Sequence, residues 1–302
     1  MNPDLDALAT RLYVTIDDAL KAHPHWVPER PEIGITPKLC DAELVTLAVI
    51  QALLGYNCEA RFIRYARTHL RPWFPYIPKR CGYNKRLRRS GELLTHVNGF
   101  LARQCPSYSD NLWLVDSTPV ECGRSRETAK RSDLAGWAQY GYCASHSRYF
   151  WGLRLHMIAT PSGLPIAFAL TGAKADERET CLEMLHHADL DTAGRVLIAD
   201  KGYRSAEFET DINTGGMTLI RPATRSEKPR PGQQALHAWR QTIESIFDTL
   251  KDQLGLERHG ARTRPGVAVR VQQRILALTA AIWHNETTQR HGPARSLIAY
   301  DH

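Results

Sequence analysis

The stretch Asn111-Leu-Trp-Leu-Val-Asp-Ser-Thr-Pro-Val120 marks the point at which the chain changes character. Before it the apolar spacing is helical, and after it short apolar runs alternate with helical segments. Residues 112–115 predict a short β-strand that ends at Asp116. Residues 195–199 predict another strand of the same kind, which ends at Asp200. We therefore expect two strands that each end in an aspartate.

The remaining elements after residue 111 predict an α/β order. Residues 149–160 and 164–170 flank the turn Pro161-Ser162-Gly163, which is typical of a hairpin, and residues 217–220 predict a further brief strand. Helices are expected over residues 178–188, 205–211, 233–254 and 267–283. Strands and helices in this order predict a mixed sheet flanked by helices.

The first hundred residues predict helices joined by proline-rich connections. Segments 41–55, 59–70 and 85–103 each have helical spacing, and residues 59–70 place arginines on one stripe of an amphipathic helix. We expect three parts: a helical DNA-binding domain over residues 1–108, an α/β domain over 109–288, and a tail over 289–302.

Positive charge is concentrated in the helical part. The 302-residue chain has a formal net charge of +7, and residues 61–89 hold ten Lys or Arg and no Asp or Glu. A second stretch without acidic residues covers 258–274. Clustered cations gain affinity for nucleic-acid phosphates through counterion release. The residues that we expect to contact DNA here are Arg61, Arg64, Arg67, Lys85, Arg86, Arg88 and Arg89.

Several classes of protein are disfavoured. The seven cysteines are odd in number, scattered and without a Cys-x-x-Cys pair, which argues against a disulfide framework and a structural zinc site. No apolar stretch approaches the roughly 18 residues of a membrane-spanning helix, and the N-terminus lacks a signal-peptide pattern. We expect a cytoplasmic protein with no membrane partner.

The two strand-terminal aspartates predict a metal site. If their strands are neighbours in one sheet, Asp116 and Asp200 project into the same crevice, and Glu244 on the helix predicted over residues 233–254 can complete the cluster. Clustered carboxylates repel one another, so such a group is expected to bind divalent cations. Magnesium fits, because it prefers oxygen ligands and serves phosphoryl transfer in pairs.

Three blocks carry a family resemblance. Leu114-Val-Asp-Ser-Thr-Pro-Val120, Ile198-Ala-Asp-Lys-Gly-Tyr203, and Arg240 with Glu244 and Lys251 resemble the signature regions of DDE transposases of bacterial insertion sequences, over about residues 110–285. His237 stands where a tyrosine is usual, and Arg154 replaces the commoner lysine. The Ala175-Asp176 pair also resembles the family's pattern.

The resemblance implies a ribonuclease-H-like catalytic core. In it Asp116, Asp200 and Glu244 would hold two Mg²⁺ or Mn²⁺ ions, for DNA cleavage at the element's ends and strand transfer of the freed 3′-hydroxyl into target DNA. Arg240, Lys251, Lys201 and Tyr203 would contact DNA. The implied partners are double-stranded DNA, at the transposon ends and at the target, and further copies in a homodimer or larger synaptic complex. The implied location is the bacterial nucleoid.

Two alternatives stay open at this point. One is a transposase-derived DNA-binding protein without catalysis, and the other is a metal-dependent nuclease that cuts without joining. A Ser-His-Asp hydrolase is disfavoured because the sequence has no Gly-x-Ser-x-Gly elbow.

Overall fold

The computed structural model describes residues 3–30, 36–143, 147–188, 190–224, 227–228, 230, 232, 236–289 and 292–300. Contacts divide the chain into two compact units. Unit 1 comprises Met1–Cys105 together with Leu250–His302, and unit 2 comprises Pro106–Thr249. No helix in the described ranges combines the length and apolarity needed to cross a membrane.

Unit 1 is helical. Its α-helices are α1 (Pro3–Ala22), α2 (Asp41–Leu53), α3 (Glu59–His69), α4 (Arg80–Arg89), α5 (Gly91–Arg103) and α10 (Arg264–Thr287). Its shorter helical turns are η1 (Pro24–Trp26), η6 (Leu256–Arg258) and η7 (Ile298–Tyr300). The π-helical turn η5 (Thr249–Gln253) begins at the last residue of unit 2 and continues into unit 1. Helix α10 is buried along most of its length and packs against α5 and α2.

The C-terminal part of unit 1 differs from the division that the sequence predicts. Residues 250–288 were expected in the α/β domain, but they group with the N-terminal helices. The physical reason is that α10 buries residues on nearly all of its sides, and its contacts with α2 and α5 cover them. Within the expected tail, Tyr300 is fully buried and its hydroxyl donates to Asn285 Oδ1 at 2.6 Å.

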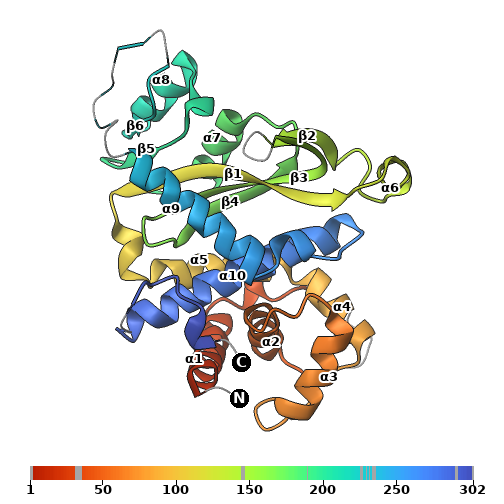
Figure 1. Ribbon diagram of the computed structural model, residues 1–302. Coiled ribbons are helices and arrows are strands. Elements are labelled where there is room, and N and C mark those ends of the chain that lie inside the picture. Colours follow the sequence, from red (N-terminus) through yellow and green to blue (C-terminus); the bar gives the residue numbers. More distant parts are fainter. Residues whose placement is uncertain are drawn as a thin grey trace. The chain divides into compact units, whose positions relative to one another are not determined.

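Unit 2 is built on a six-stranded sheet (Figure 1). Its strands are β1 (Leu112–Gly123), β2 (Gln139–Cys143), β3 (Arg148–Ala159), β4 (Pro165–Gly172), β5 (Val196–Ile198) and β6 (Thr218–Ile220). Its helices are η2 (Pro106–Ser109), α6 (Arg126–Arg131), α7 (Glu177–His187), η3 (Lys201–Tyr203), α8 (Ala206–Thr214) and α9 (Leu236–Asp248).

The sheet is mixed. The order is β2-β3-β1-β5-β6, and β4 pairs with β3 beyond the residues that β2 occupies. Strand β1 is antiparallel to β3 and parallel to β5, which is itself parallel to β6. This mixed sheet, flanked by helices, confirms the ribonuclease-H-like fold class that the sequence predicts.

Two features of unit 2 were predicted in part. The β3–β4 hairpin is confirmed, and Gly163 in its turn has φ of 97°, which suits glycine. Strand β1 is longer than expected: it continues past Asp116 to Gly123, paired with β3. A proline such as Pro119 usually argues against a strand. It is tolerated here because, among the described residues, β1 has no second partner strand beyond Leu114. Strand β2 and helix α6 were not predicted.

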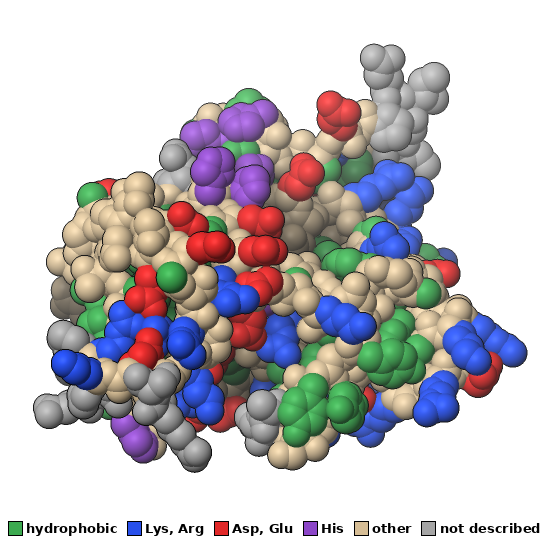
Figure 2. Space-filling model, turned by 90° about the horizontal axis from the view of Figure 1, so that it is seen from above, with side chains coloured by type: hydrophobic (Ala, Val, Ile, Leu, Met, Phe, Trp, Pro, Cys, Tyr) green, Lys and Arg blue, Asp and Glu red, His purple; other side chains and the backbone are tan. Residues whose placement is uncertain are grey.

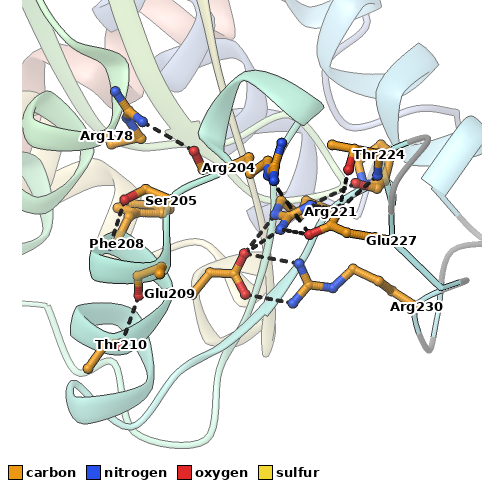
Figure 3. Close-up of polar contacts among 12 residues, drawn as sticks. Arg178, Arg204, Ser205, Phe208, Glu209, Thr210, Arg221, Thr224, Glu227 and Arg230 are labelled. Atoms are coloured by element: carbon orange, nitrogen blue, oxygen red, sulfur yellow. Dashed lines mark hydrogen bonds and ion pairs between the residues drawn. The ribbon is translucent and has the colours of Figure 1, made fainter.

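Ion pairs hold the segment that leaves β6 toward α9 (Figure 3). The Arg221 guanidinium, which is almost fully buried, pairs with Glu209 at 2.6 Å and with Glu227 at 2.8 Å. Arg230 pairs with the other oxygen of Glu209 at 2.6 Å. Hydrogen bonds from Arg230 and Arg221 lower the pKa of Glu209 to about 2. The network therefore ties this segment to α8 within unit 2.

Candidate active site

The register of two neighbouring strands brings Asp116 and Asp200 to the same level. Strands β1 and β5 pair in parallel through Leu114 and Ile198, and each aspartate lies two residues beyond its member of that pair. Adjacent strands are about 4.8 Å apart, and side chains two residues apart point to the same face. The adjacency expected from the sequence is thus confirmed, although Asp116 lies within β1 rather than at its end.

Helix α9 supplies the third carboxylate. It packs on β1 and buries Ile243, Ile246 and Phe247 along one stripe. On α9, Arg240 and Glu244 lie four residues apart, so they are neighbours on one face of the helix. A single small cavity is lined by Asp116, Asp200 and Glu244, together with Arg240, and its free volume of about 10 Å³ is close to that of one water-sized probe. Three acidic side chains that are distant in sequence therefore meet around one cavity.

The pKa of Asp116 reflects its buried position and the charges near it. Burial, followed by the nearby charges of Asp200 and Glu177, raises the pKa of Asp116 to about 7. The Ser117 N–H, which donates to Asp116 Oδ1 at 2.7 Å, and the more distant Arg240 act in the opposite direction. Burial has the largest influence and the two neighbouring carboxylates add to it, so the protonated form of Asp116 is favoured.

Asp200 is held by the turn that follows it. It caps η3, and its Oδ1 accepts from the Gly202 N–H at 2.5 Å. A Cβ at position 202 would stand 2.8 Å from Asp200 Oδ1 and 3.4 Å from Glu177 Oε2. The Lys-Gly-Tyr sequence after Asp200 therefore needs its glycine because two carboxylates approach the backbone there.

Glu177 is a site residue that the sequence argument missed. Its Oε1 accepts from Ser117 Oγ and from Arg154 Nη1, both at 2.6 Å. Arg154 Nη1 also donates to Ser117 Oγ at 2.9 Å, which closes a three-residue network. Since successive strand side chains alternate, Ser117 points away from the face that carries Asp116. Glu177 therefore approaches Asp116 and Asp200 from the face of the sheet that carries Ser117.

A signal for Glu177 was present in the Ala175-Asp176 pair. Asp176 itself caps helix α7 by accepting from the Arg178 N–H at 2.9 Å, and hydrogen bonds from Arg178 lower its pKa. The next residue along is the one that approaches Asp116 and Asp200. Arg154 stands where the family's lysine is commoner. Its guanidinium binds Glu177 and Ser117 together.

The three carboxylates have the donor atoms that a metal site needs, but they do not lie close enough together to bind one ion. All offer oxygen ligands, which magnesium and manganese accept. Among the described residues, no three His, Cys, Asp or Glu side chains lie close enough together to hold a metal ion. Glu244 is exposed, so its side chain is the one with freedom to turn toward the aspartates.

The predicted DNA contacts near this site have different surroundings. Arg240 and Lys201 are exposed. Tyr203 is fully buried and packs against Phe208 at 5.8 Å between ring centroids, which corrects the expectation that it touches DNA. Its aromatic ring is more stable in the core than in solvent. Lys251 follows α9 in the π-helical turn η5 and belongs to unit 1.

The basic residues predicted in unit 1 are mostly exposed. Arg61, Arg64 and Arg67 are exposed on α3, as are Lys85, Arg88 and Arg89 on α4. Arg86 is the exception: it pairs with Asp41 at 2.6 Å and also donates to the Leu39 carbonyl. Its guanidinium therefore fixes α4 to the start of α2, and its DNA contact stays a prediction.

The surface around α7 has the opposite character. Figure 2 shows acidic and histidine side chains gathered on one face of the molecule. Helix α7 contains both kinds, with Glu177 and Glu179 in its first turn and His186 and His187 in its last. Lys and Arg side chains lie beside the acidic ones on the same face, which therefore carries charges of both signs (Figure 2).

Comparison with known families agrees with this geometry. The family model described as "Transposase DDE domain" matches residues 108–280, which cover the sheet, Asp116, Asp200 and Glu244. No curated protein matches the chain. Because the matched residues make up more than half of the sequence, the chain belongs to the transposases with a DDE domain.

Proposed function

We propose that this transposase cleaves DNA at the ends of an insertion sequence and joins the freed 3′-hydroxyl to target DNA. One observation carries the proposal: Asp116, Asp200 and Glu244, from two neighbouring strands and a helix, line the same cavity. Family membership supports a transposase-type function and DNA as the partner. The cleavage and joining chemistry is the part that the proposal adds.

The three carboxylates would hold two Mg²⁺ or Mn²⁺ ions. Their donor chemistry supports this role, because carboxylate oxygens are the ligands that these ions accept and all three line the same cavity. When bound, the ions would supply a water activated for attack and stabilisation of the oxygens that develop charge in phosphoryl transfer. Glu244 would complete the ligand set by turning its exposed side chain toward Asp116 and Asp200.

The protein's other residues would hold the DNA in place. Arg240, four residues before Glu244, would pair with a phosphate next to the scissile one, and Lys201 would do the same beside Asp200. Phosphoryl transfer depends mainly on positioning and on stabilising charge, so these contacts would act on the rate as well as on binding. Lys251 would contact backbone phosphate from unit 1.

Synapsis would require more than one chain. Two transposon ends must be processed together, so we expect a homodimer or a larger synaptic complex on the DNA. The duplex ends and the target duplex are the proposed substrates.

The test uses DNA that ends in the element's own terminal sequence and a plasmid target. Wild type, Asp116→Asn and Asp248→Asn are compared with Mg²⁺; Asp248 is an exposed acid on α9 that does not line the cavity. We expect cleaved and strand-joined products from wild type and Asp248→Asn, and neither from Asp116→Asn. Cleavage without any joined product would show a nuclease instead. Equal cleavage by Asp116→Asn would overturn the assignment of the site.

A further inference from the structure

Unit 1 contains a large groove lined by cations. The groove has a volume of about 1000 Å³ and lies among the start of α3, one face of α4 and residues 259–270, which lead into α10. We call it the basic groove. All of these segments belong to unit 1, although the chain brings them from opposite ends of the sequence.

The charge of the basic groove is strongly positive. Five exposed cations line it: Arg80, Lys85, Arg88, Arg89 and Arg262. Its single acidic lining residue is Glu59, which is buried and already paired with Arg270 and with the Asn84 amide at 2.8 Å. In the described part of the chain, the ion pairs of unit 1 use other cations than these five. The wall of the groove therefore keeps its positive charge.

The floor of the groove holds an additional cationic donor. Arg270 is 7% exposed, and its Nη1 has no hydrogen-bond partner among the described residues. Leaving a charged donor unpaired in the interior is costly. The positive end of the α10 dipole lies beside it, because Thr263, which caps α10, and Gly266 in the first turn also line the groove. Buried and exposed groups thus favour an anion at the same place.

The spacing of the cations fits a polymer better than a small anion. On α4, Arg80 and Arg88 are eight residues apart, and Lys85 and Arg89 form a second row four residues apart on the same face. At 1.5 Å per residue, the first row covers about 12 Å of the helix axis, which is longer than the spacing between neighbouring phosphates. Successive phosphates of one strand advance by about 3.4 Å along a DNA duplex, so such a row can follow several of them.

The lining also favours duplex over single-stranded nucleic acid. Proteins that hold single strands usually stack bases on exposed aromatic rings. Among the described residues that line the basic groove, none is Phe, Tyr or Trp, and the one imidazole, His259, is buried. We propose that the basic groove binds the sugar-phosphate backbone of double-stranded DNA, through Arg80, Lys85, Arg88 and Arg89 on one wall and Arg262 on the other. The role in transposition rests on the proposed function, but the binding does not.

The first experiment measures binding without catalysis. The full chain in EDTA is titrated against a fluorescein-labelled 20-base-pair duplex of arbitrary sequence, followed by anisotropy at several salt concentrations. Arg88→Ala and Arg262→Ala, one from each wall, should each weaken binding roughly three- to tenfold and reduce the slope of log affinity against log salt by about one. Arg103→Ala, at an exposed arginine of α5 outside the groove, is the matched control and should bind as wild type does.

A second measurement locates the DNA. Cys58 and Cys81 are exposed and line the basic groove, and the backbone N–H of Arg61 lowers the pKa of the Cys58 thiol. Bound duplex should therefore protect both cysteines from iodoacetamide, as read by peptide mass spectrometry. Binding that leaves both thiols fully reactive would overturn the proposal, as would loss of affinity only when Arg61 and Arg64 on α3 are changed. Asp116→Asn should bind and protect like wild type, so failure of the proposed chemistry stays distinguishable from failure of the groove.

Discussion

The carboxylate cavity of unit 2 and the basic groove of unit 1 differ in the sign of their charge and in how widely that charge is spread. In the cavity, like charges converge on about 10 Å³ because strand register and one helix fix them there. In the groove, cations spread over about 1000 Å³ along the face of α4. The cavity concentrates unneutralised charge at one point, which suits chemistry. The groove distributes charge, which suits affinity without requiring any single residue.

This comparison predicts that the cavity fails after one substitution, whereas the groove weakens in steps. Asp200→Asn should lower Mg²⁺-dependent cleavage by about 10³-fold or more, because it removes one of the three carboxylates proposed to hold the metal ions that stabilise the transition state. Duplex binding in EDTA should stay within about twofold of wild type. Cleavage rates on end DNA check the first part, with Asp211→Asn, an exposed acid on α8, as control. A loss of only a few-fold would contradict a concentrated site.

The burial of Asp116 should also appear in folding stability. Burial raises the pKa of Asp116 from 3.8 to about 7, so the folded protein binds this proton more tightly than the unfolded chain does. The stabilisation is complete below pH about 4 and is lost as the pH rises through about 7, at about 1.4 kcal/mol per unit of pKa shift. Metal-free wild type should lose a few kcal/mol over that window.

Denaturant unfolding in EDTA at pH 5 and pH 8 measures this loss. Asp116→Asn has no titrating group at this position and should show a smaller decrease, while Asp248→Asn should behave as wild type. If wild type and Asp116→Asn lose the same stability between the two pH values, the pKa of Asp116 is not raised in the folded protein.

Gly202→Ala tests how closely the carboxylates are packed. Its Cβ would stand 2.8 Å from Asp200 Oδ1, so the aspartate must shift. A displacement of this size should lower the cleavage rate by about 10- to 100-fold while the protein stays folded. Gly215→Ala, whose Cβ would meet its nearest atom at 3.4 Å, is the matched control. Cleavage rates and thermal unfolding of the two variants provide the measurement, and equal rates would show that the approach at Gly202 has no consequence.

The smallest effect is expected at Arg154. Arg154→Lys keeps the charge but has a single nitrogen, so it cannot bind Glu177 and Ser117 as Nη1 does and the Tyr142 carbonyl as Nη2 does; we expect cleavage to fall by roughly three- to tenfold. Arg148→Lys, an exposed arginine at the start of β3, serves as control. Unchanged KM with lower kcat would show that the network of Arg154, Glu177 and Ser117 positions the site. No change in either constant would show that this network has no part in cleavage.

Sequence reasoning located the features that are local. A hydrophobic run followed by aspartate predicted both Asp116 and Asp200, and helical periodicity predicted the helix of Glu244. It could not show that β1 continues past Pro119, because that depends on β3 as a partner and on the absence of one beyond Leu114. It missed Glu177, whose role arises from contacts with residues 23 and 60 positions away.

The placement of the C-terminal segment needed the structure for the same reason. Residues 258–274 read as basic and apolar in sequence, but only their packing against α2, α4 and α5 shows which cations share a groove. Tyr203 illustrates the reverse error, because an aromatic residue beside a motif can pack in the interior instead of facing a ligand.

The division of the chain has a consequence for the order in which the protein matures. Unit 1 joins residues before 106 to residues after 249, while unit 2 is one continuous segment. During synthesis, unit 2 can fold while Arg88 still lacks Arg262 opposite it, since chains fold progressively as they leave the ribosome. The wall contributed by residues 259–270 is synthesised only afterwards, so in a newly made chain the carboxylate cavity would form before the basic groove is complete.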